Sequence, residues 1–154
     1  MGRTITRDYA GKRPFVIGVL KGCVVFLSDL MRQITLPMEI EFISGAKYRH
    51  GKVGDDELVS TAGKLIRARN RDVLIVEGIV DTGHTASELL KRIRLLEPAS
   101  VEIVTLLDKP GSHRTKIDVK YRGFSIGNDF VVGFGLDNTQ LYRNLPFIGR
   151  MLDH

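Results

Sequence analysis

Residues 73–87 read Val-Leu-Ile-Val-Glu-Gly-Ile-Val-Asp-Thr-Gly-His-Thr-Ala-Ser, and this stretch decides the fold. It opens with four consecutive β-branched or leucine residues, Val73–Val76, which is typical of a strand buried on both faces of a parallel sheet. We expect Glu77 to lie where this strand leaves the sheet. Because ligands of α/β proteins bind at the carboxyl ends of parallel strands, the segment that follows is a candidate binding site.

That segment, Asp81–Thr85, combines two hydroxyl groups with a glycine that permits positive φ. It precedes a predicted helix, which has apolar residues at helical spacing: Ala86, Leu89, Leu90, Ile93 and Leu96. The first N–H groups of a helix lack partners and carry partial positive charge, so this turn can cradle a phosphate. The alternative is a plain tight turn in which Asp81 or Thr82 caps the helix. The spacing alone does not decide between them.

The remaining chain is predicted to alternate strands and helices. Pro14 introduces a strand over Phe15–Leu20, and a helix follows with Leu27, Leu30, Met31 and Ile34 on one face. Further strands are predicted at Met38–Ile43, Val101–Leu107 and Phe130–Phe134. This alternation predicts an α/β fold, a doubly wound and mainly parallel sheet. A chain of 154 residues fits a single domain, 1–154.

Composition narrows the class of protein. The formal charge of +5 is spread along the chain without a block of like charges, which suits polyanionic small substrates and would also suit RNA. No apolar run approaches the roughly 18 residues that span a bilayer, so we expect no membrane partner. The single cysteine, Cys23, is compatible with a reducing cytoplasm and is interpreted as a small buried hydrophobic residue.

Several other motifs occur in a fixed order along the chain. They are Leu20-Lys21-Gly22, Leu107-Asp108-Lys109-Pro110, Tyr121-Arg122-Gly123-Phe124, Asp129-Phe130-Val131-Val132-Gly133, Leu136-Asp137 and Tyr142-Arg143-Asn144-Leu145-Pro146. Together with Asp81-Thr82-Gly83-His84-Thr85, which looks like a phosphoribosyl pyrophosphate (PRPP) motif, they resemble the hypoxanthine-guanine phosphoribosyltransferases, members of the type I phosphoribosyltransferases. The resemblance covers roughly Ile5 to Ile148.

This resemblance implies a purine salvage enzyme that transfers the 5-phosphoribosyl group from PRPP to hypoxanthine or guanine. It implies Mg²⁺ as cofactor, a homodimer or homotetramer, and a small hood over the purine built from the ends of the chain. The alternative is a non-catalytic regulator of the same fold that binds nucleotide or PRPP and takes RNA as a partner. Because the purine-side residues are kept and no separate DNA-binding segment is evident, the enzyme is favoured and nucleic acid is not the expected partner.

The resemblance also implies roles for individual residues. Asp81 is the expected general base. The PRPP 5-phosphate and ribose are expected to bind Glu77, Asp81, Thr82, Gly83, His84 and Thr85. Pyrophosphate is expected at Lys21, Gly22 and Arg143, often through a non-proline cis peptide beside the lysine. The purine is expected at Lys109, Phe130, Val131 and Asp137, and the metal at Glu77 and Asp137. The competing interpretations are surface lysines at Lys21 and Lys109, and a core aromatic at Phe130.

Three departures from the family stand out. Members usually have a further helix ahead of Ile5-Thr6-Arg7-Asp8-Tyr9, and we expect that helix to be missing here, where residues 1–13 are polar. Ser44–Arg71 corresponds to a loop that closes over the active site in the family. The family sequence that opens this loop is absent between Ser44 and Tyr48, so a lid role is not assigned to these two residues. Lys64–Arg69 is a candidate short helix. Finally, Gly78 stands where the family has a second acid, so we expect Gly78→Asp to restore a ribose ligand and tighten PRPP binding.

Overall fold

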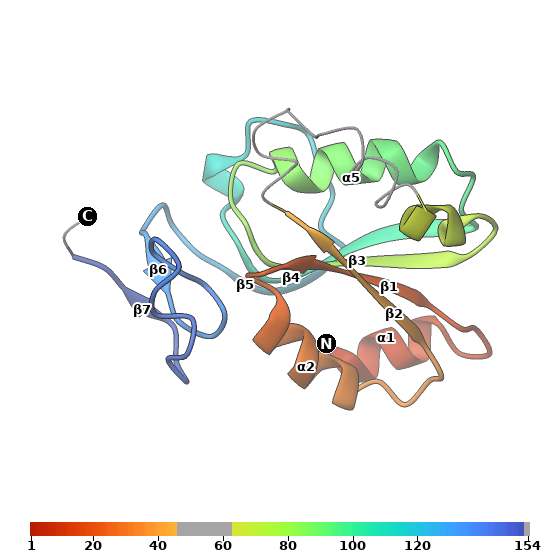
Figure 1. The fold of residues 1–154 in the computed structure, drawn as a ribbon, viewed down its shortest axis with the longest axis horizontal. Helices are drawn as coiled ribbons and strands as arrows, with labels where there is room; N and C mark the ends of the chain where they lie inside the picture. Colours follow the sequence, from red (N-terminus) through yellow and green to blue (C-terminus); the bar gives the residue numbers. More distant parts are fainter. Residues whose placement is uncertain (46–62, 153–154) are drawn as a thin grey trace.

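The computed structural model describes residues 1–45 and 63–152. Its centre is a five-stranded sheet in the order β2-β1-β3-β4-β5, and all neighbouring strands are parallel (Figure 1). The strands are β1 (Phe15–Leu20), β2 (Glu39–Ser44), β3 (Asp72–Val80), β4 (Ser100–Asp108) and β5 (Tyr121–Ser125). The stretch that decides the fold thus forms the central strand.

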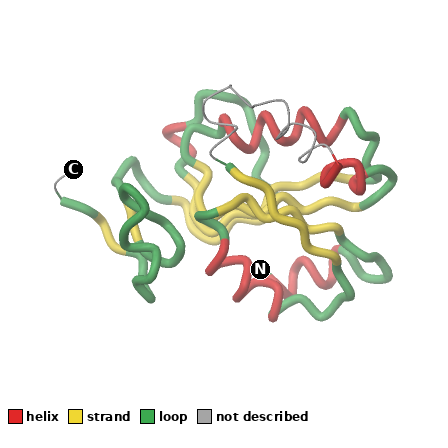
Figure 2. The backbone as a smooth tube through the Cα atoms, in the orientation of Figure 1, coloured by secondary structure: helices red, strands yellow, loops and turns green. Residues whose placement is uncertain are grey.

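Helices cover both faces of this sheet, as Figure 2 shows. On one face lie α1 (Gly2–Asp8) and α2 (Val24–Arg32), and on the other lie α5 (His84–Arg94) and the short 3₁₀ helix η1 (Ile66–Ala68). A second 3₁₀ helix, η2 (Pro110–Ser112), follows β4. The doubly wound α/β architecture predicted from the alternation of elements is therefore confirmed. Among the described residues, no helix is long and apolar enough to cross a membrane.

The central strand β3 explains why its sequence is apolar without interruption. Val73 and Ile75 pack in the core beneath α5, whereas Leu74 and Val76 pack in the core beneath α2. All four are at most 1% exposed. Successive side chains of a strand point to opposite faces, so a strand covered on both sides needs an apolar residue at every position.

Residues 1–13 contain a short helix that no pattern in the sequence predicted. Helix α1 includes Ile5, which is fully buried, and Tyr9 follows it at 3% exposure. No helix was assigned here from the sequence, because only two apolar side chains, Ile5 and Tyr9, dock this short helix on the layer of α2. The N-terminal residues therefore pack against the sheet layer rather than forming part of a hood.

Strand β5 was also missed, because Tyr121–Ser125 shows little hydrophobic periodicity. It is an edge strand, and only Tyr121 is buried in it. The Tyr121 hydroxyl donates a hydrogen bond to Asp8 at 3.0 Å and so ties β5 to α1. This bond lowers the pKa of Asp8, whereas burial, reinforced by the same bond, raises the pKa of Tyr121.

Smaller differences concern helix ends and faces. Met31 was placed on the buried face of α2, but it is 39% exposed, and Phe26 is buried instead. Helix α5 buries Ala86, Leu89, Leu90 and Ile93 as predicted, and it ends at Arg94, before Leu96. The candidate helix at Lys64–Arg69 contains η1. Ser44 ends β2, whereas the lid expected around Tyr48 lies outside the described residues.

The sheet opens at the carboxyl ends of its central strands. Pairing of β1 with β3 stops at Gly18 and Val76, whereas pairing of β3 with β4 continues to Val80 and Asp108. Glu77 therefore lies one residue beyond the last pair with β1, whereas on the other side of the strand it pairs with Thr105 of β4. The expectation that the strand ends at Glu77 was wrong, since Ile79 and Val80 extend it.

A small antiparallel unit of β6 (Val131–Val132) and β7 (Gly149–Arg150) lies beyond this opening (Figure 1). We call residues 130–151 the hood. The strand predicted over Phe130–Phe134 is shorter than expected, because Gly133, Phe134 and Gly135 all have positive φ and turn the chain. At Gly133 a side chain would meet the backbone of Phe147 as well. This turn brings Leu136–Arg143 over the ends of β1 and β3.

Candidate active site

An open cavity of about 960 Å³ lies between the carboxyl ends of the strands and the hood. Its walls come from the ends of β1, β3 and β4, the start of α5, and the hood. Every residue predicted for the site from the sequence lines it: Lys21, Gly22, Glu77, Asp81, Thr82, Gly83, His84, Thr85, Lys109, Phe130, Val131, Asp137 and Arg143. Residues up to 122 positions apart in sequence thus meet at one place, and the structure leaves none of the predicted set elsewhere.

The turn between β3 and α5 presents the amino end of a helix to this cavity. Gly83 is the N-cap with φ of 78°, and an added side chain would press against Ile117 and Thr115, so both conformation and space require glycine. No side chain of the described residues caps the helix, and the Thr82 hydroxyl accepts from the His84 N–H only at 3.5 Å. The alternative in which Asp81 or Thr82 caps α5 is therefore wrong, and the arrangement fits an anion.

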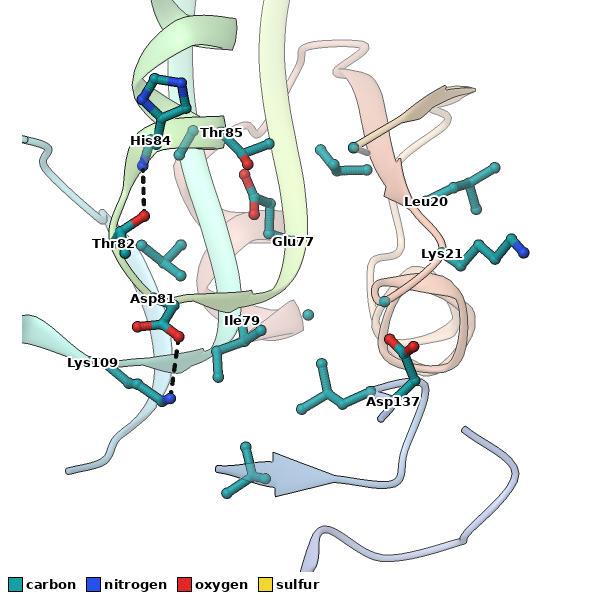
Figure 3. A pocket seen from close by; sticks show the side chains of 18 of the residues that line it. Leu20, Lys21, Glu77, Ile79, Asp81, Thr82, His84, Thr85, Lys109 and Asp137 are labelled. Atoms are coloured by element: carbon teal, nitrogen blue, oxygen red, sulfur yellow. Dashed lines mark hydrogen bonds and ion pairs between the residues drawn. The ribbon is translucent and has the colours of Figure 1, made fainter. Parts of the chain in front are cut away.

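Asp81 points toward Lys109 across the floor of the cavity (Figure 3). The Lys109 ammonium donates to Asp81 Oδ2 at 3.2 Å. The Lys109 side chain is only 6% exposed, whereas Asp81 is 52% exposed. Lysine is almost never buried unless it is paired, so the surface interpretation of Lys109 is wrong. The pair places a cationic donor beside a carboxylate that can accept a proton.

On the opposite wall, a network of charged groups joins β1 to the hood. Arg143 contacts Asp137 Oδ1 at 2.7 Å and donates to the Gly135 carbonyl at 2.8 Å. The Gln140 side-chain oxygen accepts from Lys21 at 3.1 Å and from Arg143 at 3.4 Å. Lys21 is exposed at the cavity edge, and the Leu20–Lys21 peptide is cis, as the family resemblance implied. Two cations therefore converge on one acceptor.

Phe130 and Val131 form the hood side of the cavity. Both are half-buried, and neither belongs to the two hydrophobic cores. The interpretation of Phe130 as a core aromatic is therefore wrong. An aromatic ring that is partly exposed in a cavity offers a flat apolar surface for a planar ligand.

Gly78 sits against the backbone of Gly22. An added Cβ would overlap the Gly22 carbonyl oxygen, lie 2.9 Å from its carbon and 3.1 Å from Leu136 Cδ2. Gly78 is not among the glycines with positive φ, so the constraint is space rather than conformation. The expectation that Gly78→Asp would supply a ribose ligand is wrong for this backbone, because the place where that side chain would begin is occupied.

The two predicted metal ligands lie on opposite walls. Glu77 is 8% exposed and faces Thr85, whereas Asp137 points in from the hood (Figure 3). Asp137 is held by Arg143 and by the backbone N–H of Gln140. The described residues contain no group of three or more potential metal ligands. Mg²⁺ needs only one or two carboxylates when phosphates and water complete its shell, so this donor set fits the ion bound together with a phosphorylated ligand.

The lining residues that the sequence-based prediction did not include comprise the polar residues Arg114, Thr115 and Gln140. The Arg114 N–H donates to the Thr82 carbonyl at 2.9 Å, which fastens the loop after β4 to the turn before α5. Nothing in the polar segment Gly111–Lys120 signals this contact. Gln140 lies three residues from both Asp137 and Arg143, and that spacing is the one signal that could have identified it.

Comparison with known proteins agrees with this geometry. A family model described as a phosphoribosyl transferase domain matches residues 3–139. A hypoxanthine-guanine phosphoribosyltransferase of Staphylococcus aureus is 40% identical over 153 residues, which are 98% of this chain and 84% of the relative. A bifunctional TilS/HprT protein of Listeria monocytogenes is 41% identical over 97% of this chain, but the chain spans only 23% of that relative's length.

A solved structure gives the same result. A hypoxanthine-guanine phosphoribosyltransferase from Bacillus anthracis superposes with a TM-score of 0.85 at 35% identity, covering 98% of this chain and 88% of that one. The matched region includes the sheet, the turn before α5 and the start of the hood. The chain therefore belongs to the phosphoribosyltransferase domain family, and within it to the hypoxanthine-guanine phosphoribosyltransferases.

Proposed function

We propose that this protein transfers the 5-phosphoribosyl group from PRPP to hypoxanthine or guanine, giving IMP or GMP and pyrophosphate. The observation that carries the proposal is the Asp81–Lys109 pair at 3.2 Å, next to an uncapped helix start and opposite a cationic wall, all in one cavity. A phosphate, a purine and a pyrophosphate each need a different subsite, and the cavity offers a suitable one for each. Because the sheet and the hood both contribute, residues 1–154 act as one functional unit.

The 5-phosphate binds at the turn Asp81–Thr85. The partial positive charge of the α5 amino end and its first N–H groups hold the anion, and Gly83 lets the backbone approach closely. The hydroxyls of Thr82 and Thr85 add donors. His84 contributes through its backbone N–H, since its ring points away from the Asp81–Lys109 pair in Figure 3.

Lys109 and Asp81 act on the purine. The buried ammonium donates to the 6-oxo group, exchanging its bond to Asp81 for one to the base. Asp81, released from Lys109 and half exposed to the cavity, accepts the proton that the purine ring loses as its nitrogen bonds to the ribose. Phe130 stacks on the ring, and the backbone of Val131 reads its edge.

Lys21, Gly22 and Arg143 receive the pyrophosphate, while Glu77 accepts hydrogen bonds from the ribose. Charge builds on the leaving group as the sugar becomes cationic, so fixed cations placed in advance lower the barrier. Mg²⁺ bound to the pyrophosphate, with one of the two carboxylates Glu77 and Asp137 in its shell, would neutralise part of the pyrophosphate charge. Asp137 also keeps Arg143 oriented through their 2.7 Å contact.

We also infer a reducing compartment, the cytoplasm, because the chain has a single cysteine and therefore no intrachain disulfide. Association as a homodimer or homotetramer is part of the same proposal, by likeness to the family.

A steady-state assay tests the function. Purified protein is given PRPP and Mg²⁺ with hypoxanthine, guanine or xanthine in turn, and nucleotide formation is followed by absorbance. We expect turnover with hypoxanthine or guanine and none when PRPP is omitted. If no purine turns over although PRPP binds in titration calorimetry, the protein is a ligand-binding regulator instead.

A further inference from the structure

Just behind the purine subsite lies a buried charged cluster outside the cavity lining. Asp108, the last residue of β4, is fully buried, and its carboxylate contacts His113 Nε2 at 2.7 Å and Arg122 Nε at 2.6 Å. The His113 and Arg122 side chains are 16% and 40% exposed, so both reach inward from the surface. A buried carboxylate is stable only where it is paired, and His113 and Arg122 are the partners of this one.

Hydrogen bonding in the cluster depends on His113. Of the two Asp108 oxygens, Oδ1 is bound by His113, whereas Oδ2 faces Arg122 as an ion pair and accepts no hydrogen bond within the described part of the chain. Since a carboxylate can only accept, the His113 ring carries a proton on Nε2. Loss of the imidazole would leave Asp108 buried without a hydrogen bond.

The cluster spans the loop that joins two subsites. Lys109 directly follows Asp108, and its N–H donates to the Val80 carbonyl at 2.9 Å. Four residues later His113 turns back onto Asp108, and the next residue, Arg114, donates its N–H to the Thr82 carbonyl at 2.9 Å. Fixing His113 therefore fixes both ends of the 109–114 loop: the lysine at one end and the phosphate turn at the other.

We propose that the Asp108–His113 pair, buttressed by Arg122, is a positioning device that sets the distance between Lys109 and the Thr82 turn. Neither residue of the pair lines the cavity, so each acts through others. The purine and the 5-phosphate are two ends of one nucleotide, and their subsites must be held at a fixed separation to bind it. The inference rests on the proposed function, and it predicts weaker nucleotide binding with unchanged pyrophosphate binding, because Lys21 and Arg143 lie on the opposite wall.

Three substitutions of His113 test it. His113→Ala removes the donor. His113→Gln carries an amide N–H at about the position of Nε2 and should restore the bond, whereas His113→Asn has the same group but is too short. Lys116→Ala, an exposed change in the following loop, is the matched control. Each protein is first compared with the wild type by circular dichroism and thermal melting, and the reverse reaction then gives separate KM values for GMP and pyrophosphate.

We expect His113→Ala and His113→Asn to raise the KM for GMP about tenfold, the scale of the net contribution of one hydrogen bond. The KM for pyrophosphate should stay within about twofold, and His113→Gln and Lys116→Ala should lie near the wild type. Equal rises in both KM values, no rise in either, or failure of Gln to restore GMP affinity would each overturn the positioning role. If Ala does not fold, the Asn–Gln comparison carries the same decision.

Titration calorimetry separates this inference from the proposed function. A wild-type protein that binds neither GMP nor pyrophosphate contradicts the function itself. A wild type that binds both, with a His113→Asn variant that binds GMP equally well, contradicts the positioning role alone.

Discussion

The carbonyl group of Gly22 occupies the space in which a side chain on Gly78 would begin. Its carbon lies 2.9 Å from the ideal Cβ position of Gly78, and its oxygen lies 2.7 Å from that of Gly135. The Lys21-Gly22 turn after β1 therefore packs between the central strand and the hood. It contacts the strand at Gly78 and the hood at Gly135. Glycine at position 78 and the close approach of this turn are therefore parts of the same packing arrangement.

Adding a methyl group at Gly78 should therefore destabilise the fold. We expect Gly78→Ala to lower the free energy of unfolding by about 1–3 kcal/mol, as overpacking does when backbone must shift, and Gly78→Asp to weaken PRPP binding. Urea denaturation measures the first and titration calorimetry the second. Gly127→Ala is the control, because no atom lies within 4 Å of its added Cβ. Tighter PRPP binding by Gly78→Asp would show that the turn yields readily.

Asp81→Asn should separate proton transfer from binding. The amide keeps an oxygen to accept from Lys109, so the pair can persist while the proton acceptor is lost. We expect kcat to fall about 10²–10⁴-fold, with little change in PRPP affinity. Steady-state kinetics measures kcat, and the exposed substitution Asp118→Asn is the control. An unimpaired kcat would remove Asp81 from the base role.

Lys109→Ala should act on the purine. The buried ammonium is expected to satisfy the 6-oxo group, and removal of a donor from a polar group in such a pocket costs about 1–3 kcal/mol. We therefore expect the KM for the purine to rise about five- to more than a hundredfold while that for PRPP changes little. Lys91→Ala, an exposed substitution on α5, provides the comparison. Equal losses for both substrates would indicate a merely structural lysine.

Tyr121→Phe should give a pH-dependent loss of stability. The hydrogen bond from Tyr121 lowers the pKa of Asp8 below 3.8, so its stabilising effect is present above pH 3.8 and disappears as pH falls through the lowered pKa. Burial and the same bond raise the pKa of Tyr121 above 10.0, so that contribution is present below pH 10 and disappears as pH rises through the raised pKa. The difference in Tm between the two proteins should be largest between these limits.

Melting curves over a pH series measure this difference. Asp8→Asn should reproduce the acid side of the profile, because it removes the ionised acceptor. A Tm difference that is constant from acid to alkaline pH would mean that Tyr121 contributes only by packing.

Cys23 should be chemically silent in the folded protein. It is fully buried, and burial, with a further contribution from nearby Glu77, raises the pKa of its thiol to about 12. Because the thiolate is the reactive species, a disulfide reagent at pH 8 should label the thiol only as fast as the protein unfolds. Labelling of native protein at the rate of a free thiol would contradict this burial. Addition of urea provides the positive control.

The central strand and the helix after it could be predicted from the sequence because both are local patterns. Val73–Val76 and the spacing of Ala86, Leu89 and Ile93 depend only on which faces are buried. The set of site residues was accessible for a related reason, since each follows the carboxyl end of a strand or belongs to an ordered motif. Parallel strands align these ends at one edge, so residues far apart in sequence were expected to meet, and they do.

Elements held by few contacts were harder to predict. Helix α1 depends on Ile5 and Tyr9 fitting against the layer of α2, and β5 buries only its first residue, so neither shows a periodic signal. The extension of β3 to Val80 is decided by its partner β4, which continues to pair after β1 has turned away. Pairing with a neighbour is a property of the sheet and not of the strand.

By itself, then, the sequence determined the alternation of β1 to β4 with α2 and α5, the main chemical groups of the cavity and the need for glycine at position 83, because these follow from periodicity, strand ends and local backbone conformation. Only the tertiary structure decided that Lys109 is buried against Asp81, that Gln140 joins Lys21 to Arg143, and that Gly78 has no room for a side chain. Each of these depends on distances between segments remote in sequence. Such distances are set by how the layers pack, which no local pattern specifies.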